Sequence, residues 1–407
     1  MASIRLASLR ACIGRASRRC LGIAIAAVTV FGSAAAHADF AACTLTNQPL
    51  SAGLDPINYV RLALRSDRRP LLAYSTDVHN AASLYLYVCE NVACSAGHVR
   101  YLDTSSNYFG EPSVLVRSDG RPLIVGSFMG GIRLYDCVDS DCNDYGTHTI
   151  RGNGSGIFSD LPMRLQGNGN PALLYVDWVI GPRSGQLIAH FCDDALCDNP
   201  GTEQVLAIPP LNSMFASLDL ALDSGGKLAA SYLTSEGTSN LYKYDIARCA
   251  DVGCTNVGNT ELSAPVSDST PTRTVLAMRS SDRPLALDSQ ANNRALLDCT
   301  SNGCTAADNR LLPANMPGQP FGLTLLSGNL PAFAWSSAGK IGAYACADAT
   351  CSSGHVLQAD SATQDILDGD FAISVDARPV VAYIDFDTRT LAVAACDGDV
   401  VFKNGFD

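Results

Sequence analysis

Six pairs of cysteines with one spacing, Cys-x4-Cys, recur along the chain and constrain its fold more than any other feature. Successive pairs begin 47 to 57 residues apart, and a lone cysteine, Cys396, follows the last pair after another 50 residues. A period of about 50 residues throughout a chain is typical of stacked supersecondary units rather than of separate domains. The pairs are Cys89/Cys94, Cys137/Cys142, Cys192/Cys197, Cys249/Cys254, Cys299/Cys304 and Cys346/Cys351.

Each unit predicts four short antiparallel strands. In the second unit the segments 113–116, 122–125 and 132–135 are rich in apolar and β-branched residues, with Asp-Gly and Gly-Gly dipeptides between them. Such dipeptides favour hairpin turns, and a fourth segment, 147–150, follows the cysteines. Seven units without a helical pattern predict an all-β fold, a seven-bladed β-propeller of four-stranded antiparallel blades. A β-solenoid or an array of small sandwiches is the alternative, and the unit length fits a blade better.

Each cysteine pair flanks a turn, so we expect its two sulfurs to lie on facing strands of one hairpin. Opposed positions on such strands bring two Cα atoms within bridging reach. The disulfide would then hold the fourth strand, which is the outer edge of the blade, where fraying begins. Zinc is the alternative, but a pair supplies only two ligands and no matching Cys or His pair accompanies it.

Two further cysteines, Cys43 and Cys396, predict how the ring closes. Cys396 stands in the third strand of the seventh unit, and Val401 occupies the place of its partner. Cys43 precedes the first unit as Cys94 precedes the second, which is the fourth-strand position of a blade. We therefore expect residues near 43–48 to complete blade seven, closing the ring with a Cys43–Cys396 disulfide. The chain-entropy relation assigns a loop of about 350 residues roughly 5–6 kcal/mol.

Residues 1–38 predict a signal peptide. The segment begins with basic residues, continues with an apolar run over 21–36 that is too short for a good membrane span, and ends in Ala36-His37-Ala38. We expect cleavage before Asp39. Ser17-Arg18-Arg19 also resembles a twin-arginine signal, so either a Sec or a twin-arginine leader fits.

The rest of the chain predicts an exported protein. Phe40-Ala41-Ala42-Cys43 loosely resembles a lipobox, but Phe is a poor first residue and lipidation would leave Cys396 without a partner. No other segment could span a membrane. We expect the protein to be secreted or periplasmic, because disulfides persist in those compartments. We also expect a monomer. Its propeller would extend over 39–399 and be followed by a tail at 400–407.

The charge balance excludes one class of partner. The chain has 28 Lys and Arg against 40 Asp and Glu, and removal of the leader leaves 23 basic residues and a net charge of −17. A basic surface for nucleic acid is therefore not expected. G-x-S-x-G, H-E-x-x-H and P-loop motifs are absent from the sequence, so we assign no catalytic residue.

Acidic clusters could bind calcium through their oxygen atoms. They lack an EF-hand or nonapeptide pattern, and acidic turns in so acidic a chain are usually solvated, so we expect no metal or cofactor. The clusters are Asp136, Asp139, Asp141 and Asp144, then Asp365, Asp368 and Asp370, and finally Asp385 with Asp387.

The loops that join second to third strands carry aromatic residues beside acids. An apolar platform with directional hydrogen bonds is what a sugar-binding surface needs. The candidate ligand-binding residues are Phe128, Asp177, Trp178, Arg183, Asp288, Trp335, Asp385 and Phe386. A further set precedes first strands, where packing between blades is favoured over ligand contact: Phe109, Phe158, Phe215, Phe321 and Phe371.

The repeat resembles one found in exported bacterial proteins. Ser118-Asp119-Gly120-Arg121-Pro122-Leu123-Ile124, followed by Leu134-Tyr135-Asp136-Cys137 and Cys142, is similar to that family's D-G-x-P strand and C-x4-C hairpin. The resemblance covers nearly all of 43–396 and implies a propeller and export, with no activity to transfer. The segment 398–407 is similar to the terminal F-x-x-G-F-acid tails of many exported bacterial proteins. The WD40 pattern is absent, and the kelch pattern is incomplete. The sequence boxes of sialidases stand on the third-to-fourth-strand turn, which in this chain is the cysteine hairpin.

These patterns predict a non-enzymatic propeller that binds a glycan or an extracellular or periplasmic protein on one face. A glycan-acting hydrolase of sialidase-like type is the first alternative, with Asp177, Asp288 or Asp385 as acid/base groups. Such an enzyme needs two carboxylates at a defined separation. A structural envelope protein is the second alternative.

Overall fold

The computed structural model describes most of the chain from residue 40 to residue 397. Its described residues are 40, 43–50, 56–78, 81–105, 110–128, 131–152, 160–179, 184–199, 201–210, 213–235, 241–267, 273–290, 293–361 and 365–397. They form seven antiparallel sheets and a single short 3-10 helix, η1 (Ser327–Asn329), so the predicted all-β class is confirmed.

Each of the first four blades is a meander in which strands follow one another in chain order. Blade 1 contains β2 (Ile57–Leu64), β3 (Pro70–Val78), β4 (Ala81–Cys89) and β5 (Gly97–Ser105). Blade 2 contains β6 (Ser113–Val116), β7 (Pro122–Phe128), β8 (Gly131–Cys137) and β9 (Tyr145–Arg151). Blade 3 contains β10 (Met163–Leu165), β11 (Pro171–Val179), β12 (Ser184–Phe191) and β13 (Thr202–Ala207). Blade 4 contains β14 (Met214–Leu222), β15 (Leu228–Ser235), β16 (Leu241–Cys249), β17 (Val257–Glu261) and the short β18 (Val266–Ser267), which also pairs with β16.

Blades 5 and 6 repeat this order, and blade 7 departs from it. Blade 5 contains β19 (Val275–Met278), β20 (Pro284–Gln290), β21 (Asn293–Cys299) and β22 (Ala307–Leu311). Blade 6 contains β23 (Gln319–Leu326), β24 (Leu330–Ser337), β25 (Lys340–Cys346) and β26 (Gly354–Asp360). Blade 7 contains β27 (Ile366–Ile373), β28 (Pro379–Asp385), β29 (Leu391–Asp397) and, as its outer strand, β1 (Thr44–Pro49).

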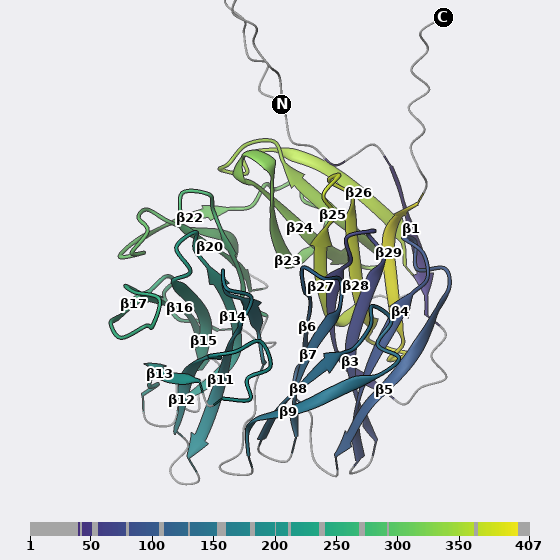
Figure 1. Ribbon diagram of the computed structural model, residues 1–407. Coiled ribbons are helices and arrows are strands. Elements are labelled where there is room, and N and C mark those ends of the chain that lie inside the picture. The colour runs from purple at the N-terminus through teal and green to yellow at the C-terminus, as the bar shows by residue number, and fades with distance from the viewer. Residues whose placement is uncertain are drawn as a thin grey trace, which may run out of the picture. The chain divides into compact units, whose positions relative to one another are not determined.

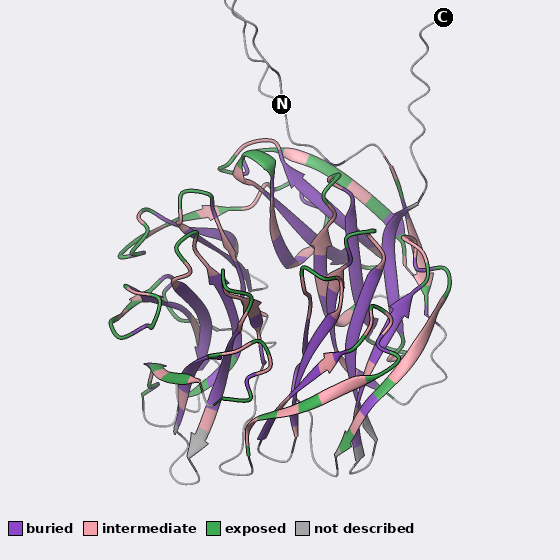
Figure 2. Ribbon diagram, viewed as in Figure 1, coloured by how far each residue is buried: buried purple, intermediate pink, exposed green. Residues whose placement is uncertain are grey.

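The blades form a ring in which each first strand is innermost. First strands of successive blades pack against one another, including β27 of blade 7 against β2 of blade 1. Figure 2 shows the second and third strands buried, whereas outer strands such as β5 and β9 carry exposed residues. The core is correspondingly divided into clusters of apolar side chains, each shared by neighbouring blades. The predicted seven-bladed propeller is confirmed.

The N-terminal strand closes the ring. Strand β1 pairs antiparallel with β29, with Leu45 opposite Cys396, so the two ends of the described chain lie side by side in one sheet (Figure 1). Cys43, just before β1, is bonded to Cys396, and their Cα atoms are 5.6 Å apart. Phe40 is buried in the core that blades 6 and 7 share. The predicted ring closure is therefore present.

The six other disulfides form as predicted, but the second cysteine of each pair lies in a different place from the one we expected. In blade 1 the first cysteine, Cys89, ends β4, and the residue opposite it on β5 is Gly97, not Cys94. Cys94 lies in the connecting turn, where its N–H donates to the carbonyl of Asn91 at 3.1 Å. The bond therefore joins the end of a strand to a turn and does not join two strands.

The expectation of facing strands was wrong for all six second cysteines, and for one physical reason. Each has a left-handed backbone, with φ between 49° and 56°, and each donates its N–H to the carbonyl three residues earlier at 3.0 to 3.3 Å. Each disulfide closes a short loop that contains a single turn, and a pair of facing strands would not fit within so short a loop. The residues concerned are Cys94, Cys142, Cys197, Cys254, Cys304 and Cys351, bonded to Cys89, Cys137, Cys192, Cys249, Cys299 and Cys346 respectively.

Arginines link each of several blades to the cysteine loop of the next blade. Arg117 donates from Nη2 to the carbonyl of Ala195 at 3.0 Å, and Arg279 donates to the carbonyl of Ala349 at 2.9 Å. Arg248 donates from Nε to the carbonyl of Asn302 at 2.9 Å. Arg65 donates in the same way to the carbonyl of Ser140. Every acceptor is the third residue between two bonded cysteines, so the disulfide loop presents one carbonyl at a constant place.

The buried ion pairs behind these arginines include one with reversed polarity. Arg117 and Arg279 stand at the start of the turn after the first strand, and they pair with Asp136 and Asp298, which directly precede a third-strand cysteine. In blade 4 the turn position holds Asp223 and the position before Cys249 holds Arg248, and these two form the pair. With either polarity the two charges are paired, and the arginine donates to a carbonyl of the next blade.

Two phenylalanines show packing between blades 6 and 7. A Cβ at Gly369 would lie 2.6 Å from Cε2 of Phe321, and a Cβ at Gly322 would lie 2.5 Å from the Cβ of Phe371. The ring of Phe321 and the Cβ of Phe371 therefore each lie against a glycine of the neighbouring blade. Phe215 is buried against Tyr232, with ring centroids 5.5 Å apart. Phe109 and Phe158 lie outside the described residues.

The ring closure predicts the number of free thiols. Seven disulfides use all 14 cysteines from Cys43 to Cys396, so a denatured, unreduced protein that begins at Asp39 should show no reactive thiol. Replacing both Cys43 and Cys396 with Ser should lower the free energy of unfolding by about 5 kcal/mol, whereas replacing Cys89 and Cys94, which close a short loop, should cost about 2 kcal/mol. Thiol titration and denaturant unfolding measure these values, and a free thiol in the wild type would contradict the pairing.

The reversed ion pair predicts a rescue by exchange. Asp223→Arg or Arg248→Asp alone leaves two like charges buried, and each should cost about 3–5 kcal/mol of unfolding free energy. The double exchange reproduces the polarity of blades 2 and 5 and should recover most of that loss. The same exchange at the exposed pair Asp119 and Arg121 should change stability by less than about 1 kcal/mol. Failure of the double exchange to recover stability would show that the two polarities are not equivalent.

Candidate functional site

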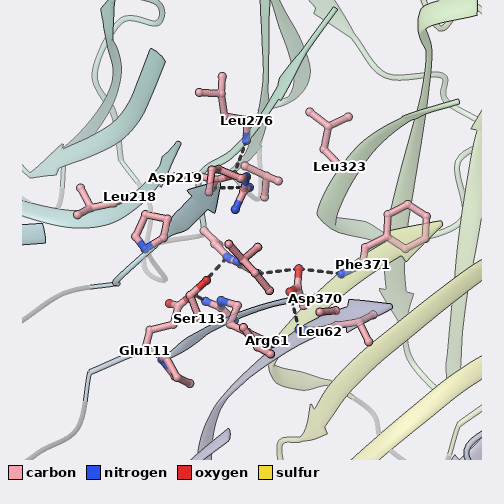
Figure 3. Close-up of a pocket in the computed structure, with 18 of the residues that line it drawn as sticks. Arg61, Leu62, Glu111, Ser113, Leu218, Asp219, Leu276, Leu323, Asp370 and Phe371 are labelled. Atoms are coloured by element: carbon pink, nitrogen blue, oxygen red, sulfur yellow. Dashed lines mark hydrogen bonds and ion pairs between the residues drawn. The ribbon is translucent and has the colours of Figure 1, made fainter. Parts of the chain in front are cut away.

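A cavity of about 330 Å³ lies on the propeller axis. The first strand of every blade contributes to its lining, which places it at the centre of the ring. Its polar residues come from six blades and include Arg61, Glu111, Asp219 and Asp370. Figure 3 shows these side chains converging from different directions, with Leu323 and Phe371 on the apolar side. A volume near the lower end of the usual range for small-molecule sites suits a small ligand or the end of a larger one.

Two arginines and a glutamate form the polar floor of the cavity. Arg61 of blade 1 pairs with Glu111 of blade 2 and, at 2.8 Å, with Asp368 of blade 7. Arg273 of blade 5 reaches across the axis, where its Nη1 donates to the carbonyl of Gly369 at 2.8 Å and its Nε lies 3.5 Å from Glu111. The side chains therefore join four blades at the axis.

The electrostatics of the floor differ between the two arginines. Burial, and next the charge of Arg273, lowers the pKa of Arg61, although Asp368 and Asp370 oppose the shift. Burial alone would also lower the pKa of Arg273, but Asp370 and Asp368 outweigh it and the pKa is raised. Arginine remains charged in proteins at any physiological pH, so both guanidiniums act as fixed hydrogen-bond donors.

The acids near the axis satisfy backbone groups of the next blade. An innermost strand has one edge without a sheet partner, so its N–H groups need other acceptors. Asp370 accepts from the N–H of Leu62, and Asp219 accepts from the N–H of Leu276, both at 2.8 Å. Asp368 accepts from Val60 at 2.8 Å in the same way. These carboxylates therefore hold neighbouring first strands together.

The axial cavity continues into a second, wider pocket. The two share Arg164, Leu276, Leu323 and Phe371, and the second has a volume of about 560 Å³. The wider pocket is lined by the last residues of several first strands, such as Met278, on the side of the first-to-second-strand turns. This is the side opposite the loops on which the sequence placed its candidate residues.

Six of the sequence-predicted ligand residues are described, and these six are spread over several blades and do not line the axial cavity. Asp177 accepts from Arg151 at 2.6 Å, and Phe128 lies under the guanidinium of Arg133 at 4.0 Å. Asp288 and Trp335 are fully buried. Asp385 accepts from the N–H groups that follow it, at 2.8 and 2.9 Å, and Phe386 is 48% exposed beside Arg389.

The contacts of two members of that set, Trp178 and Arg183, lie outside the described part of the structure. Trp178 belongs to β11, but its side chain lies outside the part of the structure that is described, and Arg183 lies outside the described residues. Asp177, Asp288 and Asp385 stand on second strands of three different blades. The described residues do not bring these three acids together in one site, so their role as the acid/base pair of a hydrolase stays a prediction.

Sequence analysis did not predict the cavity residues as ligand-binding residues, although the sequence holds a signal for them. We aligned the units on the first residue after each first strand, which is Arg117 in blade 2. The residue six positions before it is polar in five of the blades: Glu111, Asp160, Ser217, Arg273 or Asp368. The residue four positions earlier is Arg61, Ser113, Asp219 or Asp370 in four of them. A polar residue recurring inside an apolar innermost strand is the pattern that marks the axis, and it becomes visible only once the units are aligned by their turns.

Two other groups of titratable side chains lie away from the cavity. The imidazole of His190, whose Nδ1 lies 3.5 Å from the carboxylate, the hydroxyl of Tyr175, which donates to it, and the charge of Arg151 lower the pKa of Glu203 to about 2 against the effect of burial. Burial raises the pKa of Asp245 from 3.8 to about 6, although Lys243 acts in the opposite direction. Both groups pack between strands and neither lines the axial cavity.

Several of the residues considered for calcium have other partners. Asp136 pairs with Arg117, and Asp141 with Arg65. Asp139 accepts the N–H of Asp141 at 2.8 Å within the cysteine loop. Over the described residues, no group of three or more His, Cys, Asp or Glu side chains is arranged to hold a metal ion. None of the helices in the described part of the chain has the length and apolar character needed to cross a membrane.

Comparisons with known proteins show the fold. No protein-family model matches the chain, and no curated protein matches it in sequence. Virginiamycin B lyase from Staphylococcus aureus has a similar structure, with a TM-score of 0.52 at 13% identity over 87% of this chain and 99% of the lyase.

Two more solved structures agree. A protein of unknown function from Dyadobacter fermentans has a TM-score of 0.50 at 12% identity, over 87% of this chain and 98% of that protein. An ulvan lyase of a polysaccharide lyase family has a TM-score of 0.51 at 10% identity, over 88% of this chain and 95% of the lyase. Similarity at such low identity shows the shared propeller fold alone.

The raised pKa of Asp245 predicts how stability depends on pH. The native carboxyl keeps its proton to higher pH than the unfolded chain, so the native state binds more protons between about pH 3.8 and 6. Stability contributed at this site therefore falls as pH rises through that window. Asp245→Asn should be about 1–2 kcal/mol more stable than the wild type at pH 7 and gain nothing at pH 3.5. Denaturant unfolding at several pH values measures this, with the exposed Asp193→Asn as control; a difference independent of pH would contradict it.

Proposed function

We propose that the protein is a non-enzymatic binding protein that takes the end of a glycan into its axial cavity. The single observation that carries this proposal is the lining of that cavity. Guanidinium donors, carboxylate acceptors and apolar side chains from all seven blades surround one small space. Sugar hydroxyls both donate and accept hydrogen bonds, whereas the ring carbons are apolar, so a sugar complements such a lining.

Binding is favoured over hydrolysis because the cavity's acids are already engaged. A glycosidase needs one carboxyl that holds a proton and a second that is free to act as base or nucleophile. Asp219 and Asp370 each accept backbone N–H groups, and Glu111 faces two arginines. These contacts tie each of the three carboxylates to the ring, so none of them is free to act as the base or nucleophile of such a pair.

A glycan is favoured over a protein ligand by the size of the cavity. A folded protein partner needs a broad surface, on the order of 800 Å² on each side, whereas the axial cavity admits only a small group. One propeller of the same fold, the ulvan lyase, is described as bound to a saccharide, which indicates that a propeller is compatible with this ligand class. A hydrolase and a structural envelope protein remain the competing functions that the experiment below separates.

We also propose that the protein is exported and processed before Asp39, as a monomer with its propeller over 39–399 and a tail at 400–407. What supports export is the number of disulfides. Two contacts support processing upstream of Phe40 instead of at Cys43. Phe40 is buried in the core, and Cys43 is bonded to Cys396, so lipidation of Cys43 would remove both.

A glycan array tests the proposed site. Val116 lines the cavity, is half-buried at the end of β6 and packs against the edge of the core between blades 1 and 2, so Val116→Trp should block entry and abolish binding. Thermal unfolding of this variant checks that the core accepts the larger side chain. Val375→Trp is the matched control, because Val375 is 98% exposed on a turn and outside the cavity lining. Trp178→Ala tests the loops that the sequence favoured.

Each outcome of the array decides between functions. Loss of binding in Val116→Trp alone supports the axial site, whereas loss in Trp178→Ala alone would move the site to the loops. Release of sugar by the wild type would replace binding with hydrolysis. A wild-type protein that binds no glycan would refute the proposal and leave the structural role.

A further inference from the structure

Arg164 is the most accessible of the three arginines in the axial cavity. Its side chain is 38% exposed, compared with 6% for Arg61 and 18% for Arg273. It belongs to β10 and lines both the axial cavity and the wider pocket. A ligand that enters from the wider pocket therefore meets Arg164 before it meets the floor.

The charge of Arg164 is only partly matched by its neighbours. Its Nη1 donates to the carbonyl of Met163 at 2.9 Å and its Nη2 to Asp219 at 3.2 Å. A guanidinium has five N–H donors, and these are the two contacts that the described residues make with it. Asp219 in turn accepts the N–H groups of Leu220 and Leu276, each at 2.8 Å, so its negative charge is shared with two amides.

The other two arginines are held more completely. Arg61 contacts the carboxylates of Glu111 and Asp368, and Arg273 contacts those of Glu111 and Asp370. Each therefore has two acidic partners where Arg164 has one. The floor thus has three carboxylates for two arginines and leaves neither arginine in excess. The neck of the cavity, where it meets the wider pocket at Arg164, Leu276, Leu323 and Phe371, retains a donor group that can contact a bound ligand.

Resting on the binding function proposed above, we propose that the bound glycan end carries a carboxylate, as a uronic acid does, and that Arg164 binds it. A planar guanidinium matches a carboxylate with two parallel hydrogen bonds, which are stronger than those between neutral groups. The sugar ring would then lie against Leu276, Leu323 and Phe371, which line the same neck. A single acidic group is indicated because the chain's net charge of −12 disfavours the approach of a polyanion.

Matched ligands and matched variants test this assignment. The probes are uronic-acid glycans bound on the array and the same glycans after chemical reduction of their carboxyl groups to alcohols. We expect the wild type to bind the acidic form at least about tenfold more tightly, by calorimetry. Arg164→Gln should remove that preference, and Arg164→Lys should keep part of it. Arg121→Gln is the control, since Arg121 is 37% exposed, is paired with Asp119 at 2.8 Å and lies outside the cavity lining.

The outcomes separate this inference from the function on which it rests. Equal binding of acidic and reduced glycans, or an unchanged preference in Arg164→Gln, overturns the carboxylate while leaving glycan binding in place. Loss of preference in Arg121→Gln would also overturn it, because general charge would then be the cause. Absence of binding to every glycan refutes both proposals. A tripeptide with a free C-terminal carboxylate, compared with its amide, identifies a peptide as the source if it binds instead, which overturns the uronic acid. Unchanged thermal unfolding of each variant shows that the fold is intact.

Discussion

Ring closure is the constraint on which the rest of this structure depends. A four-stranded blade has two apolar faces, and each face is buried only by a neighbouring blade. An open row of seven blades would leave two such faces in water. Pairing of β1 with β29 removes both ends at once, and the Cys43–Cys396 bond joins strands that are separated by 353 residues. The axial cavity exists only because the ring is closed, since every blade contributes to its lining.

Polar contacts link neighbouring blades in two places, near the axis and near the cysteine turns. Near the axis, Asp219 and Asp370 accept backbone N–H groups of the next first strand. On the side of the cysteine turns, Arg117 and Arg279 donate to carbonyls in the next disulfide loop. The axial contacts answer a need of the backbone, because buried N–H groups at a sheet edge are costly unless they are paired. The contacts at the cysteine turns answer a need of the side chain, because the exposed loop carbonyls accept from largely buried guanidiniums. The need of the backbone explains why the axial acids are poor candidates for acid/base catalysis.

Much of the fold could be predicted from residue pattern, and much of the site could not. The period of the cysteines is a local and regular signal, and it led to seven blades and to the pairing of Cys43 with Cys396. Facing-strand geometry for Cys94 and its five counterparts was a wrong prediction, because a spacing reveals which cysteines pair without revealing that the second one adopts a left-handed backbone. The aromatic residues of the loops drew attention because of their composition, yet Trp335 is in the core. Arg61 and Arg273 stand far apart in the chain and meet only across the axis.

The sequence by itself determined the repeat, the disulfide pairs and the strand that closes the ring. Each of these depends on residues that recur at a fixed interval, and recurrence can be read without coordinates. Only the tertiary structure decided which charged residues face one another, because a ring brings positions from all seven units to one point. It also decided which arginine remains accessible, since Arg61, Arg164 and Arg273 differ in burial and in acidic partners and not in chemistry.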